Sequence, residues 1–251
     1  MLLPRIIPCL LLSKHDLVKT INFSNPSYVG DPINTVKIFN EKKADELFLL
    51  EIKATVDKYE PNFELIKKIA RESRMPLCYG GGIKNLDHAK KIFNFGVEKI
   101  ALSSVIFENL DIVSKISNFS GANSIVVVLD LKKTGDGYSI FINNGKKKID
   151  IKISELIYKL ENLGVGEIVL NSIDRDGTMS GYDYDMIDSI INKINVSLTI
   201  LGGAGSYRDL EIAAKKYGSI GISCGSFFIY KGPRKAVLIS YPQKVDKLKL
   251  I

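Results

Sequence analysis

Eight short runs of apolar, β-prone residues recur along the chain, and segments with helical spacing separate most of them. The runs cover residues 6–12, 46–52, 77–79, 99–102, 124–131, 167–171, 198–201 and 219–223. Most are nearly continuous in apolar residues, which is typical of strands buried on both faces of a parallel sheet. Apolar residues at helical spacing over residues 62–74, 154–163 and 183–194 predict helices between the runs. This alternation predicts an α/β fold, a (β/α)8 TIM barrel.

The length of the chain and an internal repeat agree with this prediction. The 251 residues give about 31 residues for each of eight strand–helix units. The segment Asp45-Glu-Leu-Phe-Leu-Leu50 resembles Gly166-Glu-Ile-Val-Leu-Asn171, at an offset of 121 residues. We therefore expect residues 1–251 to form one domain made of two half-barrels, about 1–120 and 121–251.

Composition excludes several classes of protein. Hydrophobic residues make up 45% of the chain and charged residues 25%, as in ordinary globular domains, which excludes a disordered or collagen-like chain. The net charge of +7 comes mostly from scattered lysines, a pattern that favours an anionic small molecule over a nucleic acid. Cys9, Cys78 and Cys224 stand in apolar stretches without metal-ligand spacing, so we expect buried thiols and no metal or other cofactor. The first apolar run is too short to span a membrane, and we expect a cytoplasmic protein.

Two glycine-rich turns follow predicted strands. Gly80-Gly81-Gly82 follows the third run, and Gly202-Gly203-Ala204-Gly205 follows the seventh. A turn of this kind between a buried strand and a helix exposes backbone N–H groups that bind phosphate. The neighbouring strands end in Ser103-Ser104 and Gly225-Ser226, which add hydroxyl and amide donors. One such turn is weak evidence because glycine also permits tight turns; two turns related by the repeat predict a ligand with a phosphate at each end.

A carboxylate and two long insertions mark the same end of the predicted barrel. Asp130 ends the fifth run, where an aspartate serves either as a loop cap or as a general acid/base, and the phosphate turns favour the second role. Long insertions at residues 13–30 and 132–150 follow the first and fifth runs, and residues 138–142 predict a hairpin. Loops at this end of a barrel often cover a substrate, and the alternative is that both are variable surface loops.

Eight motifs occur in order along the chain. They are Arg5-Ile-Ile-Pro-Cys9, Gly30-Asp-Pro32, Asp45-Glu-Leu, Gly80-Gly-Gly-Ile83, Gly166-Glu-Ile, Ser172-Ile-Asp-Arg-Asp-Gly-Thr178, Gly181-Tyr-Asp183 and Gly202-Gly-Ala-Gly205. Together they resemble the cyclase subunit of imidazole glycerol phosphate synthase more than the related isomerase of histidine biosynthesis, and the resemblance ends at about Tyr230. In that family a glutaminase partner releases ammonia, which crosses the barrel and attacks a bis-phosphorylated ribonucleotide. The products are imidazole glycerol phosphate and an aminoimidazole carboxamide ribonucleotide.

The resemblance implies roles for individual residues. Asp130 matches the family's second catalytic aspartate, and Lys19 matches a lysine of the first loop near the substrate. The phosphate-binding positions correspond to Gly82, Ser104, Asp176, Gly177, Gly203 and Ser226. Four charges that gate ammonia at the barrel floor, where the glutaminase docks, correspond to Arg5, Glu46, Lys99 and Glu167. Charges at this end of a barrel also have a simpler interpretation, a stabilising ion-pair ring.

One departure from the family affects the chemistry. The family's first strand ends with an aspartate that is its principal general acid/base, and this chain has Leu11 at that position. Leucine transfers no proton, and the loss of a general acid/base typically lowers a rate by ~10²–10⁴. Ser103-Ser104 replaces Asn-Thr, Glu51 replaces an aspartate, Thr20 replaces a glycine, and the family's long final helix after Tyr230 is absent.

Three functions agree with these residues. The first is a cyclase-derived subunit that takes ammonia from a glutaminase partner and supplies a separate sugar amidotransferase, because the chain resembles a branch linked to acetamidino modification of bacterial surface sugars, a part of lipopolysaccharide biosynthesis. The second is a working cyclase in which Asp130 and water share the proton transfers. The third is a non-catalytic scaffold that binds a partner.

The two histidines add little to this choice. His88 lies in the helix predicted over residues 85–95, and we expect its side chain to be exposed to solvent. His15 lies in the first long insertion, where it is weak evidence for a contact with the substrate.

Overall fold

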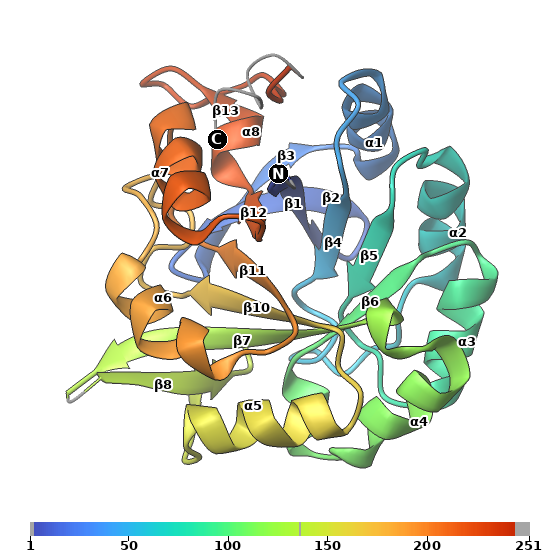
Figure 1. Cartoon of the computed structure of the whole chain (residues 1–251). Coiled ribbons are helices and arrows are strands. Elements are labelled where there is room, and N and C mark those ends of the chain that lie inside the picture. Colours follow the sequence, from blue (N-terminus) through green and yellow to red (C-terminus); the bar gives the residue numbers. More distant parts are fainter. Residues whose placement is uncertain (1–2, 136, 244–251) are drawn as a thin grey trace.

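Eight parallel strands close into a barrel (Figure 1). The computed structural model describes residues 3–135 and 137–243. The barrel strands are β1 (Arg5–Ser13), β4 (Leu47–Glu51), β5 (Leu77–Gly80), β6 (Lys99–Leu102), β7 (Ile125–Thr134), β10 (Glu167–Ser172), β11 (Ser197–Leu201) and β12 (Gly221–Cys224). The ring closes because β1 pairs with both β4 and β12, while β7 pairs with both β6 and β10. The predicted barrel is confirmed, and each of its strands coincides with one of the eight apolar runs.

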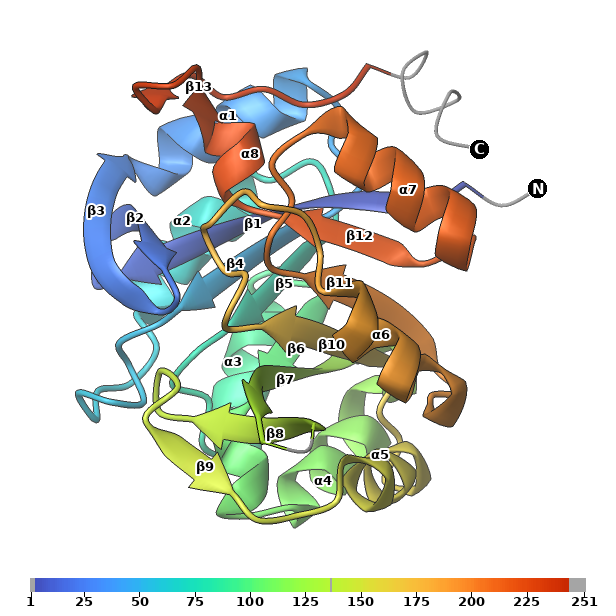
Figure 2. The same cartoon turned by 90° about the vertical axis from the view of Figure 1, so that its left-hand side faces the viewer.

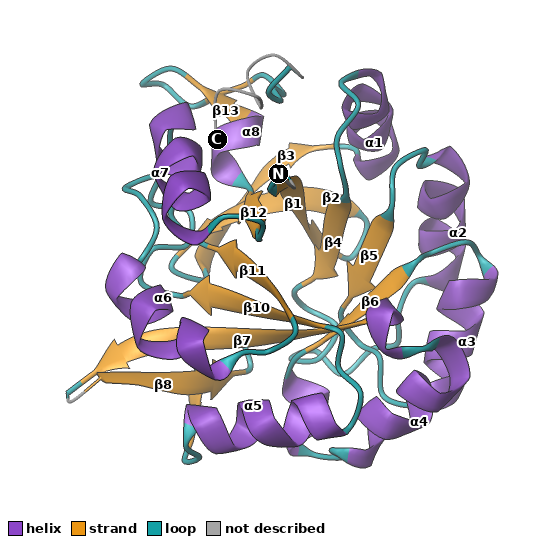
Figure 3. Ribbon diagram, viewed as in Figure 1, coloured by secondary structure: helices purple, strands orange, loops and turns teal. Residues whose placement is uncertain are grey.

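Helices surround the barrel on its outer side (Figure 3). They are α1 (Pro32–Glu41), α2 (Phe63–Glu72), α3 (Leu86–Asn94), α4 (Asp111–Ser120), α5 (Ile153–Asn162), α6 (Tyr184–Ile190), α7 (Tyr207–Tyr217) and the short α8 (Ser226–Ile229), with 3₁₀ turns at Ser104–Phe107, Ala122–Ser124 and Ile191–Lys193. Asp31, Asn62, Asn85, Asp183 and Ser206 cap five of them by accepting a backbone N–H. Such caps fix where each helix begins, and therefore where the preceding loop must end.

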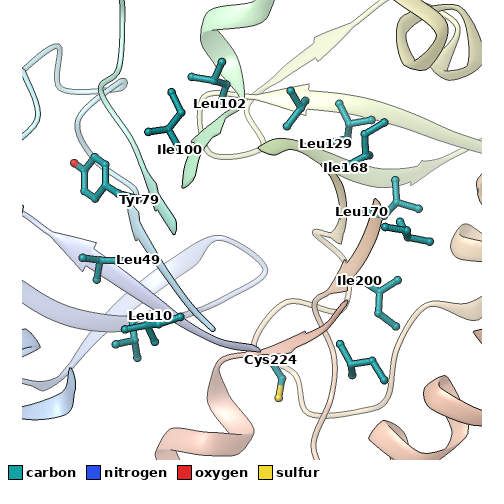
Figure 4. Packing of buried hydrophobic residues seen from close by; sticks show 14 of the residues in the cluster. Leu10, Leu49, Tyr79, Ile100, Leu102, Leu129, Ile168, Leu170, Ile200 and Cys224 are labelled. Atoms are coloured by element: carbon teal, nitrogen blue, oxygen red, sulfur yellow. The ribbon is translucent and has the colours of Figure 1, made fainter. Parts of the chain in front are cut away.

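Apolar side chains fill both sides of the strands. Residues on the outer side of successive strands, such as Leu49, Ile100 and Leu170, pack under the helices and follow one another around the ring (Figure 4). A second, smaller cluster fills the lumen and includes Phe48, Val126 and Val169. Because side chains alternate along a strand, each run must be apolar at both kinds of position, which explains its nearly continuous apolar character.

Two antiparallel hairpins extend from the barrel at the same end (Figure 2). The first, β2 (Asp16–Ile21) with β3 (Ser24–Gly30), occupies the segment interpreted from sequence as a long polar loop. It forms because β1 continues past the barrel and pairs with β2, which buries Leu17 and Val18. The second, β8 (Gly137–Ile142) with β9 (Lys147–Ile149), confirms the hairpin predicted within the later insertion.

The expectation for His88 is wrong. Its side chain is buried in α3, on the same helix face as Ala89 and Ile92, and its ring meets the edge of Phe63 from α2 at a centroid distance of 5.6 Å. The helical spacing of this segment was clear, but which arc of α3 meets α2 depends on how the two helices pack. The three cysteines agree with expectation, since all are buried and free.

The segment after α8 packs back against the start of the barrel. A short pair, β13 (Tyr230–Lys231) and β14 (Ala236–Val237), leads to Tyr241, whose side chain is 5% exposed. The Tyr241 hydroxyl donates to the carbonyl oxygen of Ile6 over 2.8 Å and accepts the backbone N–H of Asp45 over 2.9 Å. In the described part of the chain, no helix is long and apolar enough to cross a membrane.

Tyr241→Phe should therefore destabilise the fold by about 1–3 kcal/mol, because it leaves the buried carbonyl of Ile6 and the partly buried N–H of Asp45 without this partner. The measurement is the free energy of unfolding in urea. Tyr28→Phe is the matched control, since Tyr28 is 66% exposed and its hydroxyl loss should change stability by less than about 0.5 kcal/mol. Equal effects of the two substitutions would contradict the role given to Tyr241.

Candidate functional site

A pocket opens at the carboxyl ends of the barrel strands, and residues of both hairpins help to line it. The two hairpins lie at this end of the barrel (Figure 2). The nine residues that the resemblance assigns to the mouth all line the pocket: Leu11, Lys19, Gly82, Ser104, Asp130, Asp176, Gly177, Gly203 and Ser226. These residues come from seven parts of the chain that are far apart in sequence, and the closed ring of strands brings them together. The predicted residues Arg5, Glu46, Lys99 and Glu167 lie instead at the opposite end of the same strands.

Asp130 projects from β7 into this pocket. Its Oδ1 accepts a hydrogen bond of 2.8 Å from Nδ2 of Asn171, the residue directly opposite on β10. Burial raises the pKa of Asp130 and the nearby Asp176 raises it further, while hydrogen bonds from Asn171 and Ser103 lower it, so the pKa of the carboxyl is about 7. A carboxyl with this pKa is half protonated near neutrality and can both give and accept a proton there.

Lys19 reaches the pocket from the first hairpin. Its Nζ donates to the carbonyl oxygen of Cys9 over 2.6 Å, and a Cβ added to Gly225 would lie only 2.2 Å from that nitrogen. Burial lowers the pKa of Lys19, although the neighbouring Asp176 opposes the effect. The absence of a side chain at Gly225 therefore leaves the space into which the lysine fits, and Nζ of Lys19 is held at the wall of the pocket.

The two glycine-rich turns are built alike. A Cβ on Gly81 would lie 2.3 Å from the carbonyl oxygen of Glu51, at the end of the neighbouring strand β4. A Cβ on Gly202 would lie 2.7 Å from the carbonyl oxygen of Ser172, at the end of β10. In both turns the close approach of two backbones requires glycine, so the two walls of the pocket repeat one construction.

Gly177 has a further contact that the sequence did not indicate. A Cβ at this position would lie within 1.9 Å of the carbonyl oxygen of Thr20, because the first hairpin rests on the turn at residues 176–177. The Thr20 hydroxyl donates to Oδ2 of Asp176 over 3.0 Å, and the backbone N–H of Asn22 donates to the carbonyl of Asp176 over 2.9 Å. Gly177 thus serves the seating of the hairpin as well as any ligand.

Leu11 occupies the mouth of β1, where a catalytic carboxylate was expected by resemblance. Its side chain is partly exposed and, together with Leu50, packs on top of the apolar cluster in the lumen. Glu51, at the end of the adjacent strand, is buried and its carboxylate accepts the backbone N–H groups of Lys14 and Lys53. This carboxylate therefore holds two loops in place, and one wall of the pocket is apolar where the opposite wall carries Asp130.

The floor of the barrel carries a closed ring of four charges. Arg5 donates to Glu46 and, over 2.9 Å, to Glu167, while Nζ of Lys99 donates to the same two carboxylates over 2.8 Å each. Burial favours the neutral forms, yet the opposite charges outweigh it: the pKa of Arg5 and of Lys99 is raised, and the pKa of Glu167 is lowered. Arg5, Lys99 and Glu167 are therefore charged at neutral pH, and together with Glu46 they form the ring at the lower end of the lumen.

Two polar residues of the lumen were not predicted from the sequence. Thr199, fully buried on β11, donates its hydroxyl to Oε1 of Glu167. Asn171 contacts Asp130 as described above. A signal for Asn171 was present in the sequence. It lies four positions after Glu167 on one strand, so the two side chains share the inner face of that strand. No comparable signal pointed to Thr199.

The family model described as "Histidine biosynthesis protein" matches residues 5–233, which includes the floor and the mouth of the barrel. The chain belongs to this family. A relative in Leptospira interrogans, named for the HisF subunit of imidazole glycerol phosphate synthase, is 51% identical over 98% of each chain. A Vibrio vulnificus relative named hisF3 is 47% identical over 100% of this chain and 97% of its own. The HisF subunit of Lactococcus lactis strain IL1403 is 37% identical over 84% and 82%.

The chain is thus a HisF-type member of the histidine biosynthesis family, and its match to these relatives covers both ends of the barrel. The structure brings the mouth residues into one pocket and the floor residues into one ring, but the two groups remain at opposite ends of the lumen.

In this HisF-type barrel, Asp130→Asn should stabilise the protein at neutral pH. The pKa of Asp130 is raised to about 7 in the folded state, against about 3.9 in an unfolded chain, so the folded state binds more protons between these values. Stability therefore falls as pH rises through this window. We expect equal thermal stability of the two proteins below about pH 4 and a gain on the order of 1–3 kcal/mol for Asp130→Asn above about pH 7. A gain that is independent of pH would contradict this assignment.

Proposed function

We propose that this HisF-type chain is a cyclase-derived subunit that receives ammonia from a glutaminase at the barrel floor and delivers it at the mouth to a phosphorylated small molecule, with the histidine-pathway reaction impaired. The observation that carries the proposal is the pairing of an intact charge ring at the floor with Leu11 at the mouth. The machinery to admit ammonia is complete, whereas one expected proton carrier is missing.

The charge ring at the floor favours a gate that can open for ammonia over a ring of ion pairs that only stabilises the barrel. The ring contains two cations and two anions, so displacing one side chain leaves the others with alternative partners. Directly above it, the lumen is filled by apolar side chains such as Cys78 and Val126, an environment in which a neutral molecule costs far less to place than an ion. A glutaminase docked at this face would place released ammonia at the entrance of that lumen.

The mouth supports binding of an anion with two phosphates. The two glycine-rich turns face one pocket, each is followed along the chain by a capped helix, and Lys19 adds a hydrogen-bond donor at the pocket wall. Asp130 is the proton carrier that we assign, with Leu11 as the degenerate catalytic position. We propose phosphate binding by Gly82 with Ser104 on one side, and by Asp176, Gly177, Gly203 and Ser226 on the other.

The destination of the ammonia is the finer part of the proposal. The resemblance to the branch linked to acetamidino sugars favours transfer to a separate sugar amidotransferase in lipopolysaccharide biosynthesis. The greater identity to the relative named hisF3 than to the Lactococcus lactis subunit supports a specialised copy of the cyclase. A copy that no longer has to make the histidine intermediate is free to lose the carboxylate at Leu11.

The first test supplies the purified chain with the bis-phosphorylated ribonucleotide of the cyclase family and excess ammonium salt at high pH. We expect turnover to be ~10²–10⁴ lower than that of a HisF subunit with the carboxylate, because one general acid/base is missing. Leu11→Asp should restore turnover by at least tenfold. Leu11→Asn is the matched control, because asparagine has the size of aspartate but no titratable proton, and it should leave turnover unchanged. Leu12→Asp would not serve, since Leu12 is buried under the helices.

The second candidate function is a working cyclase, and the pKa of about 7 at Asp130 favours it, because one such carboxyl can serve as both acid and base. The same assay separates the two. Turnover within about tenfold of that of an ordinary HisF subunit, with no gain from Leu11→Asp, would show that the chain is a working cyclase. It would contradict the proposal that the histidine-pathway reaction is impaired.

Glu167→Ala tests whether ammonia passes the floor. In a complex with the glutaminase subunit of imidazole glycerol phosphate synthase, we expect the substitution to uncouple glutamine hydrolysis from product formation at the mouth, because the ring loses a carboxylate that both cations contact. The ratio of product to released glutamate should change at least severalfold. Glu211→Ala, at an exposed carboxylate on α7, is the matched control. An unchanged ratio for Glu167→Ala would favour the scaffold without an ammonia path.

A further inference from the structure

The part of the pocket that lies between the two glycine-rich turns is apolar. Leu11 and Leu50 are neighbours in the register of β1 and β4, and both line the pocket. Val128 on β7 and Leu201 on β11 line the same space. All four side chains belong to the apolar cluster of the lumen or pack against it. Together they form a surface that we call the apolar base of the pocket.

The apolar base separates the two turns that are proposed to bind phosphate. One turn follows β5 and the other follows β11, and three strands lie between β5 and β11 in either direction around the ring. The two turns therefore lie on opposite sides of the barrel mouth. A barrel of eight strands, spaced about 4.8 Å apart and tilted by ~36°, is roughly 15 Å across its backbone. A ligand held at both turns must cross the apolar base.

Two polar side chains beside the apolar base already have partners within the protein. Nζ of Lys19 donates to the carbonyl oxygen of Cys9, and Nδ2 of Asn171 donates to Asp130. On the side of β1 and β4, Leu11 and Leu50 present only methyl and methylene groups to the pocket. A ligand hydroxyl placed over these two side chains gives up hydrogen bonds to water and gains none, which weakens binding.

We infer that the pocket takes a ligand with two phosphates whose central part is apolar where it crosses Leu11 and Leu50, instead of the polyhydroxylated chain of a sugar bisphosphate. The inference rests on the proposed function and names the substrate class of the same site. It gives Leu11 a role in specificity that is separate from the missing proton transfer. A carboxylate at this position accepts hydrogen bonds from ligand hydroxyls, whereas a leucine side chain packs against carbon.

Two probes of matched length test this substrate class. Hexane-1,6-diol bisphosphate and mannitol 1,6-bisphosphate share a six-carbon chain and two phosphates, and they differ in four hydroxyl groups. Their affinities for the isolated chain are measured by titration calorimetry at constant pH and ionic strength. We expect the hexane compound to bind about tenfold more tightly or better, since an apolar site discriminates against an added hydroxyl by up to about 10². Its binding should also show the more negative heat-capacity change, which marks the burial of apolar surface.

Leu11→Asn tests whether the preference arises at the apolar base. The substitution places a neutral hydrogen-bonding amide there, without the repulsion that a carboxylate exerts on phosphates. It should reduce the ratio of the two affinities by about threefold or more, the effect of one hydrogen bond to a ligand hydroxyl. Leu238→Asn is the matched control, because Leu238 is 60% exposed and lies outside the pocket, and it should leave the ratio unchanged. Equal ratios in the two variants would contradict the role given to Leu11.

The outcomes separate this inference from the proposed function. Equal affinities of the two probes, or tighter binding of the mannitol compound, would overturn the inference and leave the proposed function standing. If neither bisphosphate binds, the two-phosphate site of the proposed function fails, and the inference fails with it. An unchanged product ratio for Glu167→Ala would count against the proposed ammonia path alone, because the calorimetry involves neither glutaminase nor turnover.

Discussion

The closed ring of eight strands creates a lumen with two chemically different ends, and the remaining features depend on that closure. Pairing of β1 with β12 and of β7 with β10 directs alternate side chains of every strand inward. The same alternation places charged residues at the floor, apolar residues in the middle and polar residues at the mouth of a single strand such as β10. An open sheet with the same sequence would expose these groups to solvent and separate Arg5 from Glu167.

Burial determines the chemistry at both ends, with opposite results. At the floor, Glu167 and the two cations meet as complementary charges, so they remain ionised in spite of burial. At the mouth, Asp130 has an amide and a second carboxylate as neighbours, so burial raises its pKa to about 7. Replacing the other expected carboxylate by Leu11 makes one wall of the pocket apolar. The mouth therefore has one of the two carboxylates that the resemblance implies for proton transfer, and this difference supports the proposal of a changed reaction.

Local sequence predicted the strands well and the hairpins unevenly. The barrel strands were recognisable because each is buried on both faces, and the second hairpin was recognisable because the mostly apolar run Tyr138 to Ile142 stands between glycine-bearing turns. The first hairpin was not recognised because β3 is mostly exposed and polar, and it exists only because β1 extends far enough to pair with β2. His88 was misjudged for a related reason, since a helical period shows that a helix has an apolar face but not how a neighbour such as Phe63 widens it.

The fold class and the order of the strands follow from residue type and spacing along the chain, and the resemblance to the family identifies Leu11 as a replacement. Which distant groups meet is a property of the folded chain alone. The bond between Asn171 and Asp130, the closing of the charge ring through Lys99, and the seating of Thr20 on Gly177 all join residues from different strands or loops. Their distances are set by the register of neighbouring strands and by the packing of backbone against backbone, and no local pattern in the chain encodes either one.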